Sequence, residues 1–474
     1  MQNKQLPFFL IAISIILGLT LPVLIQDGMF MDGMLYTCVS KNLANGIGSF
    51  WFPVFSKYGF GGLQTFHEHP PLIFGIEAVF FKLLGNGMYT ERIYVLFTLA
   101  ITCCLIVSLW KYSNKDKIEA TIGWLPMILW IMVPVCFWSF SNNMQENTMG
   151  IFILLAVLFY LKATTQRSFL FLISSGFFIF LATFSKGIPG FFPVAVPFIY
   201  WLCLKKINVR KLIFQTFILA IIPVLIYAIL LCFNDARESL SNYFIKRVLH
   251  RIGENPTVES HFYILGRILV ELLPSIGFTA IIFFIFRKKI AFQKERVVLA
   301  AFFILTGLAG VVPLALTMVQ KGFYFIPSLP FFAIGLALFI SEPIAAWAGN
   351  VLNPIAIGRN SKKGLTIFSV LLFSAVIIFS ASNIGKKSRD ADMINDVGEF
   401  GKIIPEFSAV SISDHRWNDW PLQCYLIRYH NISIDPTNPA NEFRIIDKNA
   451  PDSTVANYQK VELPTLQFDL YRKK

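Results

Sequence analysis

Long apolar runs recur along most of this chain, and they constrain its fold more than any other feature. Eleven of them approach or exceed the length needed to cross about 30 Å of hydrocarbon, which takes roughly 20 residues in a helix. Only 15% of the residues are charged, against about 25% in an ordinary globular chain. The sequence therefore predicts an all-α polytopic membrane protein with about eleven transmembrane helices. We place them near residues 6–26, 89–111, 121–140, 148–162, 168–184, 190–204, 211–233, 263–286, 297–317, 323–340 and 364–382.

The basic residues between these runs predict the orientation of the chain. Lys and Arg concentrate in every second connection, as they do in the cytoplasmic loops of membrane proteins. This pattern places the N-terminus in the cytoplasm and the C-terminal tail outside, in what we expect to be a bacterial inner membrane. The net charge of +13 then reflects loops that meet membrane lipid, and we expect no nucleic acid among the partners.

The first outer loop, residues 27–88, is longer than a simple connection. Its segment 70–85 is apolar, but as a helix it spans only about 22–24 Å, and it contains Glu77 and Lys82. We therefore expect interfacial helices in this loop rather than a further span.

The tail after the last run is polar and alternates between two patterns. We expect a helix near 388–403, a strand at 409–413, a helix at 419–430 and two more strand-like segments. The sequence thus predicts two domains, a transmembrane domain at 1–383 and a small extracytoplasmic α/β domain at 384–474.

Ionisable residues gather at the outer ends of the apolar runs, where such groups usually line a polar cavity. Asp32 follows the first run. As a helix N-cap it would have only a structural role, whereas as a general base it would take the proton of an attacking hydroxyl group. The sequence leaves both readings open.

The segment His67-Glu68-His69 is the most compact polar signal in the chain. Two His and one Glu suit a divalent cation, although alternate residues of an extended segment point to opposite faces. A metal would then need a ligand from elsewhere. The alternative is a polar cluster that precedes a helix started by proline.

Further candidates lie at the ends of later runs. Glu146 is either the first-turn carboxylate of the fourth span or part of a site. Lys186 and Lys321 each lie where a cation needs an anion, for which phosphate is a natural choice. Arg247 and Arg251 lie one helical turn apart and would bind either the phosphate of a substrate or anionic lipid head groups.

Several segments, read together, resemble the GT-C membrane glycosyltransferases, in particular the branch with protein O-mannosyltransferases and the lipid A aminoarabinose transferase. The likeness covers roughly residues 5–340, in order and spacing. The matching segments are DGMLY, FHEHPPL, ENTMGIFILLAVLFY, LATFSKGIPGFFPVAVP, HFYILGRILVELLPSIG and KGFYFIPSLPFFAIGLAL.

This resemblance implies roles for individual residues. Asp32 would be the catalytic base, and Glu146 would be a second catalytic carboxylate where the family usually has Asp. Glu68 would join a divalent metal ion with His261 as its distant partner. The resemblance also implies phosphate contacts. They are Lys186, Lys321, Tyr324, Arg247, Arg251 and His69. Two departures weaken the case for an aminoarabinose donor, because Leu35 and His69 replace an Arg and a Lys of that branch.

The expected function is transfer of a sugar from a polyprenyl-phosphate-linked donor to an acceptor that the sequence does not identify. Two alternatives stay open. A transporter or flippase for a lipid-linked sugar would place polar groups near the bilayer midplane within paired repeats. A glycan ligase or polymerase would use a diphosphate-linked donor.

Overall fold

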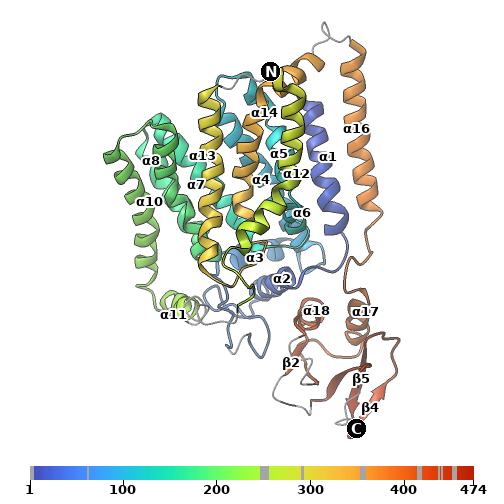
Figure 1. Cartoon of the computed structure of the whole chain (residues 1–474). Coiled ribbons are helices and arrows are strands. Elements are labelled where there is room, and N and C mark those ends of the chain that lie inside the picture. Colours follow the sequence, from blue (N-terminus) through green and yellow to red (C-terminus); the bar gives the residue numbers. More distant parts are fainter. Residues whose placement is uncertain are drawn as a thin grey trace. The chain divides into compact units, whose positions relative to one another are not determined.

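The computed structural model describes the chain except for residues 1–4, 61–62, 246–255, 290–292, 353–358, 414–418, 436–437, 439–440 and 451–455. It is mostly helical with a small C-terminal sheet, as the sequence predicts (Figure 1). The chain forms two compact units. The helical unit comprises Met1–Leu24, Val95–Ser141 and Gln145–Asn383, and the mixed unit comprises Ile25–Tyr94, Asn142–Met144 and Ile384–Lys474.

The helical unit is an assembly of long apolar helices (Figure 1). Its elements are α1 (Leu6–Leu24), α4 (Thr90–Ser113, whose first turn belongs to the mixed unit), η2 (Ile118–Ile122), α5 (Trp124–Ile131), α6 (Pro134–Ser139), α7 (Gln145–Gln166), α8 (Phe169–Lys186), η3 (Ile188–Ala195), α9 (Val196–Leu204), α10 (Val209–Leu230), α11 (Asn234–Tyr243), α12 (Tyr263–Phe286), η6 (Arg287–Lys289), α13 (Lys294–Val311), η7 (Val312–Leu316), η8 (Ile326–Ser328), α14 (Leu329–Val351) and α16 (Arg359–Ala381).

Nine helices within the described residues are long and apolar enough to cross a membrane, and the protein is an integral membrane protein. The other two expected spans take another form. The run near 121–140 is divided, because Pro134 cannot continue α5 and instead begins α6. The run near 190–204 lies within the shorter segment Ile188–Leu204, which starts as a 3₁₀ helix.

The end of α8 depends on a glycine. Gly187 has φ of +84°, and a Cβ there would lie 1.8 Å from the hydroxyl oxygen of Tyr243. Only glycine adopts this conformation and leaves the necessary space. Gly187 therefore ends the helix immediately after Lys186, which places that cation in the last turn of α8.

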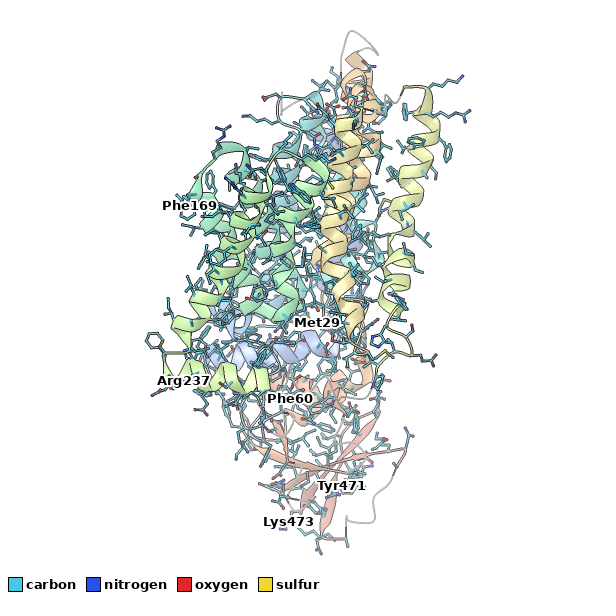
Figure 2. All side chains as sticks on the ribbon, turned by 60° about the vertical axis from the view of Figure 1, so that its left-hand side comes forward. Met29, Phe60, Phe169, Arg237, Tyr471 and Lys473 are labelled. Carbon is cyan, nitrogen blue, oxygen red and sulfur yellow. The ribbon has the colours of Figure 1, made fainter. Side chains whose placement is uncertain are left out.

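The mixed unit combines the first loop with the C-terminal tail. Its sheet has the order β2-β1-β3-β5-β4, in which β1 runs parallel to β2 and β3 while β5 runs antiparallel to β3 and β4. The elements are α2 (Met31–Ala44), α3 (Leu72–Leu84), α17 (Ala391–Phe400), β1 (Ala409–Ile412), α18 (Trp420–His430), β2 (Ser433–Asp435), β3 (Phe443–Asp447), β4 (Tyr458–Val461) and β5 (Phe468–Lys473). Tyr471 and Lys473 mark β5 in Figure 2.

This unit contains the elements expected for the tail, and it adds β4 and β5. The expected interfacial helix appears as α3, which is too short to be one of the nine spans. The domain boundary at residue 383/384 stays a prediction.

Candidate functional site

In the mixed unit, Asp32 lies in the first turn of α2. The helix begins at Met31 with Phe30 as its N-cap residue, so Asp32 is inside the helix and does not cap it. The carboxylate is half-buried at a helix N-terminus, where the dipole favours negative charge. The N-cap reading of Asp32 is therefore excluded, and the general-base reading stays a prediction.

The start of α2 is fixed by the segment Asn142–Met144. The backbone N–H of Phe30 donates to the side-chain oxygen of Asn142 over 2.8 Å. A Cβ on Gly33 would lie 1.8 Å from the carbonyl oxygen of Asn142. The glycine in DGMLY thus lets a second backbone pass directly beside the turn that carries Asp32.

A buried carboxyl group lies farther along this unit. Glu77 on α3 is 1% exposed. Its carboxyl oxygens form hydrogen bonds with the Ser40 hydroxyl group at 2.7 Å and with the Asn143 amide at 2.7 Å. Burial raises the pKa of Glu77 to about 7, although both hydrogen bonds oppose that rise. Glu77 thus connects α2, α3 and the segment 142–144.

His69 contacts α2 on the side chain of Tyr36. Its Nε2 atom lies 3.1 Å from the Tyr36 hydroxyl group, and Tyr36 is one turn beyond Asp32. His67 instead pairs with the Thr65 hydroxyl at 2.8 Å. The two buried histidines therefore have different partners, with the half-buried Glu68 between them.

In the helical unit, Glu146 and Lys186 form a buried ion pair. Lys186 Nζ lies 2.6 Å from Glu146 Oε1, and the side chains are 8% and 0% exposed. The ammonium group also lies over the rings of Phe323 and Tyr324, at 5.7 and 5.8 Å from their centroids. Two candidates, Lys186 and Tyr324, thus lie together with Glu146.

The turn that contains Lys321 and Tyr324 lies against another cation. Tyr324 N–H donates to the Lys321 carbonyl oxygen at 3.1 Å, and the Lys321 side chain is exposed. Gly322 in this turn faces Arg267, whose Nε would be 3.3 Å from an added Cβ. Arg267 also pairs with Glu271 at 2.5 Å. Lys186 and Lys321 are therefore accompanied by a third basic residue.

No family model matches this chain, and no curated protein matches it. Solved structures do. The chain is similar to ArnT from Cupriavidus metallidurans bound to undecaprenyl phosphate, with a TM-score of 0.65 and 13% identity over 98% of this chain and 97% of that one. For the apo state of the same protein, the TM-score is 0.63 at 11% identity, over 98% and 96% of the two chains.

This chain has the GT-C fold. An apo oligosaccharyltransferase from Archaeoglobus fulgidus shares the fold more loosely, with a TM-score of 0.53 and 12% identity over 92% of this chain and 65% of that one. At these sequence identities the structural likeness establishes the fold alone. The resemblance predicted from the motifs is therefore confirmed for the fold.

The metal hypothesis for this chain stays a prediction. The described residues contain no group of three or more His, Cys, Asp or Glu side chains arranged to hold a metal ion. His261 is exposed, and its Nδ1 lies 2.8 Å from the carbonyl oxygen of Ala315. Glu68 belongs to the mixed unit, and His261 belongs to the helical unit. Arg247 and Arg251 lie outside the described residues.

Sequence reasoning missed three polar residues of the helical unit. Arg267 and Glu271 lie four residues apart within an apolar run, and charges within a span are a signal that could have identified them. Gln145, beside Glu146, is 2% exposed, and neither polar atom of its side chain has a hydrogen-bond partner among the described residues. Its amide resembles that of any polar residue at a helix start, so no pattern singled it out.

Proposed function

We propose that this protein transfers a sugar from a polyprenyl-phosphate-linked donor to a protein, lipid or glycan acceptor at the outer face of a bacterial inner membrane. The observation that carries the proposal is the buried Lys186–Glu146 pair beneath Tyr324, in a fold shared with ArnT bound to undecaprenyl phosphate. A buried cation beside aromatic rings suits a phosphate group more than an acceptor hydroxyl.

In the proposed reaction an acceptor hydroxyl oxygen attacks the anomeric carbon of the sugar. The carboxylate of Asp32 takes the hydroxyl proton, and a new carbon–oxygen bond forms. The bond between the anomeric carbon and the phosphate oxygen breaks, and its electron pair leaves with the polyprenyl phosphate. A single displacement inverts the anomeric centre.

Cationic side chains stabilise the charge that develops on the leaving phosphate. Lys186 is the main candidate, and the carboxylate of Glu146 fixes the position of its ammonium group. Lys321, Arg267 and the Tyr324 hydroxyl group supply further contacts. His69, Arg247 and Arg251 remain proposed contacts. A divalent metal held by Glu68 and His261 would stabilise the same charge as a Lewis acid.

The N-terminus lies in the cytoplasm and the C-terminal domain outside in this proposal, because the basic connections follow the positive-inside rule. The donor sugar is a hexose or a pentose. The mechanism requires no nucleotide-sugar, since the donor is already activated by its phosphate bond to the lipid.

The test is release of free polyprenyl phosphate by the purified protein, supplied with mannosyl- and pentosyl-phosphoprenol donors. We expect Asp32→Asn to slow release by roughly 100-fold or more, the usual contribution of a general base. Asp392→Asn is the matched control, because Asp392 also lies in the first turn of a helix but is exposed on α17.

Three results would contradict the proposal. If Asp32→Asn and Asp392→Asn release product at equal rates, Asp32 is not the base. If no donor yields free polyprenyl phosphate while a labelled donor crosses the bilayer of proteoliposomes, the protein is a transporter. Release only from a diphosphate-linked donor would indicate a ligase or polymerase.

A further inference from the structure

An open surface pocket with a volume of about 370 Å³ lies at one end of the helical unit, apart from all the candidate residues above. It is formed between the C-terminal parts of α4 and α7 and the connection that follows α4. Three of its six lining residues are lysines, and we call it the three-lysine pocket. It is lined by Ser108, Lys111, Tyr112, Lys115, Leu158 and Lys162.

The charges of this pocket are not compensated by the protein. Within the described part of the chain, none of the three lysines forms a salt bridge, whereas nearby Glu119 is paired with Arg296 at 2.7 Å. Three ammonium groups around one cavity repel each other, and that repulsion is relieved when an anion binds between them. The pocket therefore has the charge of an anion site.

The contacts that hold the walls of the pocket in place do not neutralise its positive charge. Lys162 Nζ lies over the rings of Phe159 and Phe171, at 5.2 and 5.8 Å from their centroids. The Tyr112 hydroxyl group hydrogen bonds with the Thr165 hydroxyl group and so joins the ends of α4 and α7. These contacts fix the two helix ends while the ammonium groups stay available to a ligand.

The position of the pocket indicates which anion it meets. Helices α4 and α7 are both candidate spans. Lys111 lies in the last turn of α4 and Lys162 lies one turn before the end of α7, near the level of the lipid head groups. The same end is marked by Phe169, an exposed aromatic residue at the start of α8 (Figure 2). Leu158 adds an apolar wall beside the lysines.

We propose that the three-lysine pocket binds the phosphate group of an anionic membrane phospholipid, with its acyl chains along the exposed apolar side of α4, which includes Phe97. Basic pockets between transmembrane helices are suited to such head groups. Ser108 and Tyr112 add hydroxyl groups to the three ammonium groups. This inference is independent of the proposed transfer reaction, because it concerns a second site and a different ligand.

The experiment measures lipid retention by native mass spectrometry of the purified full-length protein. Phosphatidylglycerol is titrated against phosphatidylcholine, and inorganic phosphate is added in a separate arm. We expect the triple variant Lys111→Gln/Lys115→Gln/Lys162→Gln to bind phosphatidylglycerol roughly tenfold to a hundredfold more weakly than the wild type. Phosphatidylcholine should be retained equally by both.

The matched control is Lys205→Gln/Lys206→Gln/Arg210→Gln, which removes the same charge from exposed positions in the connection between α9 and α10 and in the first turn of α10. It should retain phosphatidylglycerol within about twofold of the wild type, since each exposed charge contributes little without a pocket. If the first triple variant does not fold, the exposed Lys115→Gln alone should weaken binding by about fivefold.

Equal retention by the pocket variant and the control would overturn the proposal. So would a wild type that does not distinguish phosphatidylglycerol from phosphatidylcholine. Displacement of the lipid by millimolar inorganic phosphate would assign the pocket to a free anion and overturn its assignment to a lipid.

Discussion

The ammonium group of Lys186 lies 2.6 Å from a carboxylate oxygen of Glu146, and both side chains are buried. Lys186 is the last residue of α8, and Glu146 is in the first turn of α7. Each charge therefore lies at the helix end whose dipole favours it, in addition to pairing with the other. The pair links one end of α8 to one end of α7, and these two helices pack against each other along their length.

Removal of one partner should be more harmful than removal of both. Lys186→Met leaves the Glu146 carboxylate buried without its cation, and we expect the free energy of unfolding to fall by about 3–5 kcal/mol. The double variant Lys186→Met/Glu146→Gln should recover much of that loss. Thermal and denaturant unfolding in detergent would measure both, and the exposed Lys321→Met should change stability by less than about 0.5 kcal/mol. A double variant no more stable than Lys186→Met would contradict this account.

The hydrogen bonds around Glu77 indicate whether its carboxyl group is protonated in the folded protein. Ser40 Oγ lies 2.9 Å from the Tyr36 carbonyl oxygen and 2.7 Å from Glu77 Oε2, but the hydroxyl group has only one proton. If Ser40 donates to the carbonyl oxygen, a protonated Glu77 can donate to Ser40. The network is therefore complete with a neutral Glu77, in agreement with its raised pKa of about 7.

A pH dependence of stability follows from this raised pKa. The unfolded chain loses the Glu77 proton near the ordinary glutamate pKa of 4.5, whereas the folded chain keeps it until its raised pKa of about 7. The contribution of Glu77 to the free energy of unfolding is fully present below pH 4.5 and is lost progressively as the pH rises to 7. The difference of about 2.5 pKa units corresponds to roughly 3 kcal/mol.

Glu77→Gln should remove this slope. The variant should be more stable than the wild type above pH 7, because an amide has no proton to lose, and unfolding measured between pH 4 and pH 8 checks it. Glu462→Gln, at an exposed position of the mixed unit, should leave the wild-type slope in place. A Glu77→Gln variant with the wild-type slope would refute a neutral Glu77.

Most of the helical fold could be predicted from the sequence, because an apolar run long enough to span a membrane has few other stable states. The exceptions depend on backbone chemistry within the runs. Pro134 divides a run that is long enough by composition alone. In the tail, β4 and β5 were missed because few of their residues are buried, only Tyr458 in β4 and Phe468 and Leu470 in β5.

The candidate site was only partly predictable. Lys186 and Glu146 stand out as charges at the ends of apolar runs, but their pairing depends on the packing of α7 against α8, which no local pattern encodes. Glu77 looks like the polar face of an interfacial helix. Only the fold shows that this face is buried against Ser40 and Asn143.

Asp396 holds the start of β5 through its carboxylate group. This buried side chain on α17 accepts backbone hydrogen bonds from Leu466, Gln467 and Phe468 at 2.6, 2.7 and 2.9 Å. Asp396→Ala would leave three donors without an acceptor. The buried N–H of Phe468 would cost about 1–3 kcal/mol, and the two part-buried donors would cost less because water can reach them. We expect hydrogen exchange of amides 466–468 to accelerate strongly. Asp392→Asn on the same helix should not change it, and slow exchange in Asp396→Ala would rule out this role.

Arg428 joins α18 to the start of α4 within the mixed unit. We expect that no other side chain can reproduce the geometry of its guanidinium donors. The guanidinium group is 2% exposed and donates to Glu91 at 2.7 Å and to the carbonyl oxygens of Asn86 and Gly87 at 3.0 and 2.8 Å. A lysine has one compact ammonium group and cannot reach all three acceptors with the same geometry. Arg428→Lys should therefore lower the free energy of unfolding by about 2–4 kcal/mol.

Arg472→Lys is the matched control for this substitution. Arg472 pairs with Glu442 at 2.9 Å, but both side chains are more than half exposed. A surface pair of this kind contributes about 0–1 kcal/mol, so Arg472→Lys should be almost neutral in the same unfolding measurement. Equal effects of the two substitutions would mean that the buried contacts of Arg428 add nothing beyond its charge. A large loss confined to Arg428→Lys would show that α18 is held to the start of α4 by the directed donors of the guanidinium group.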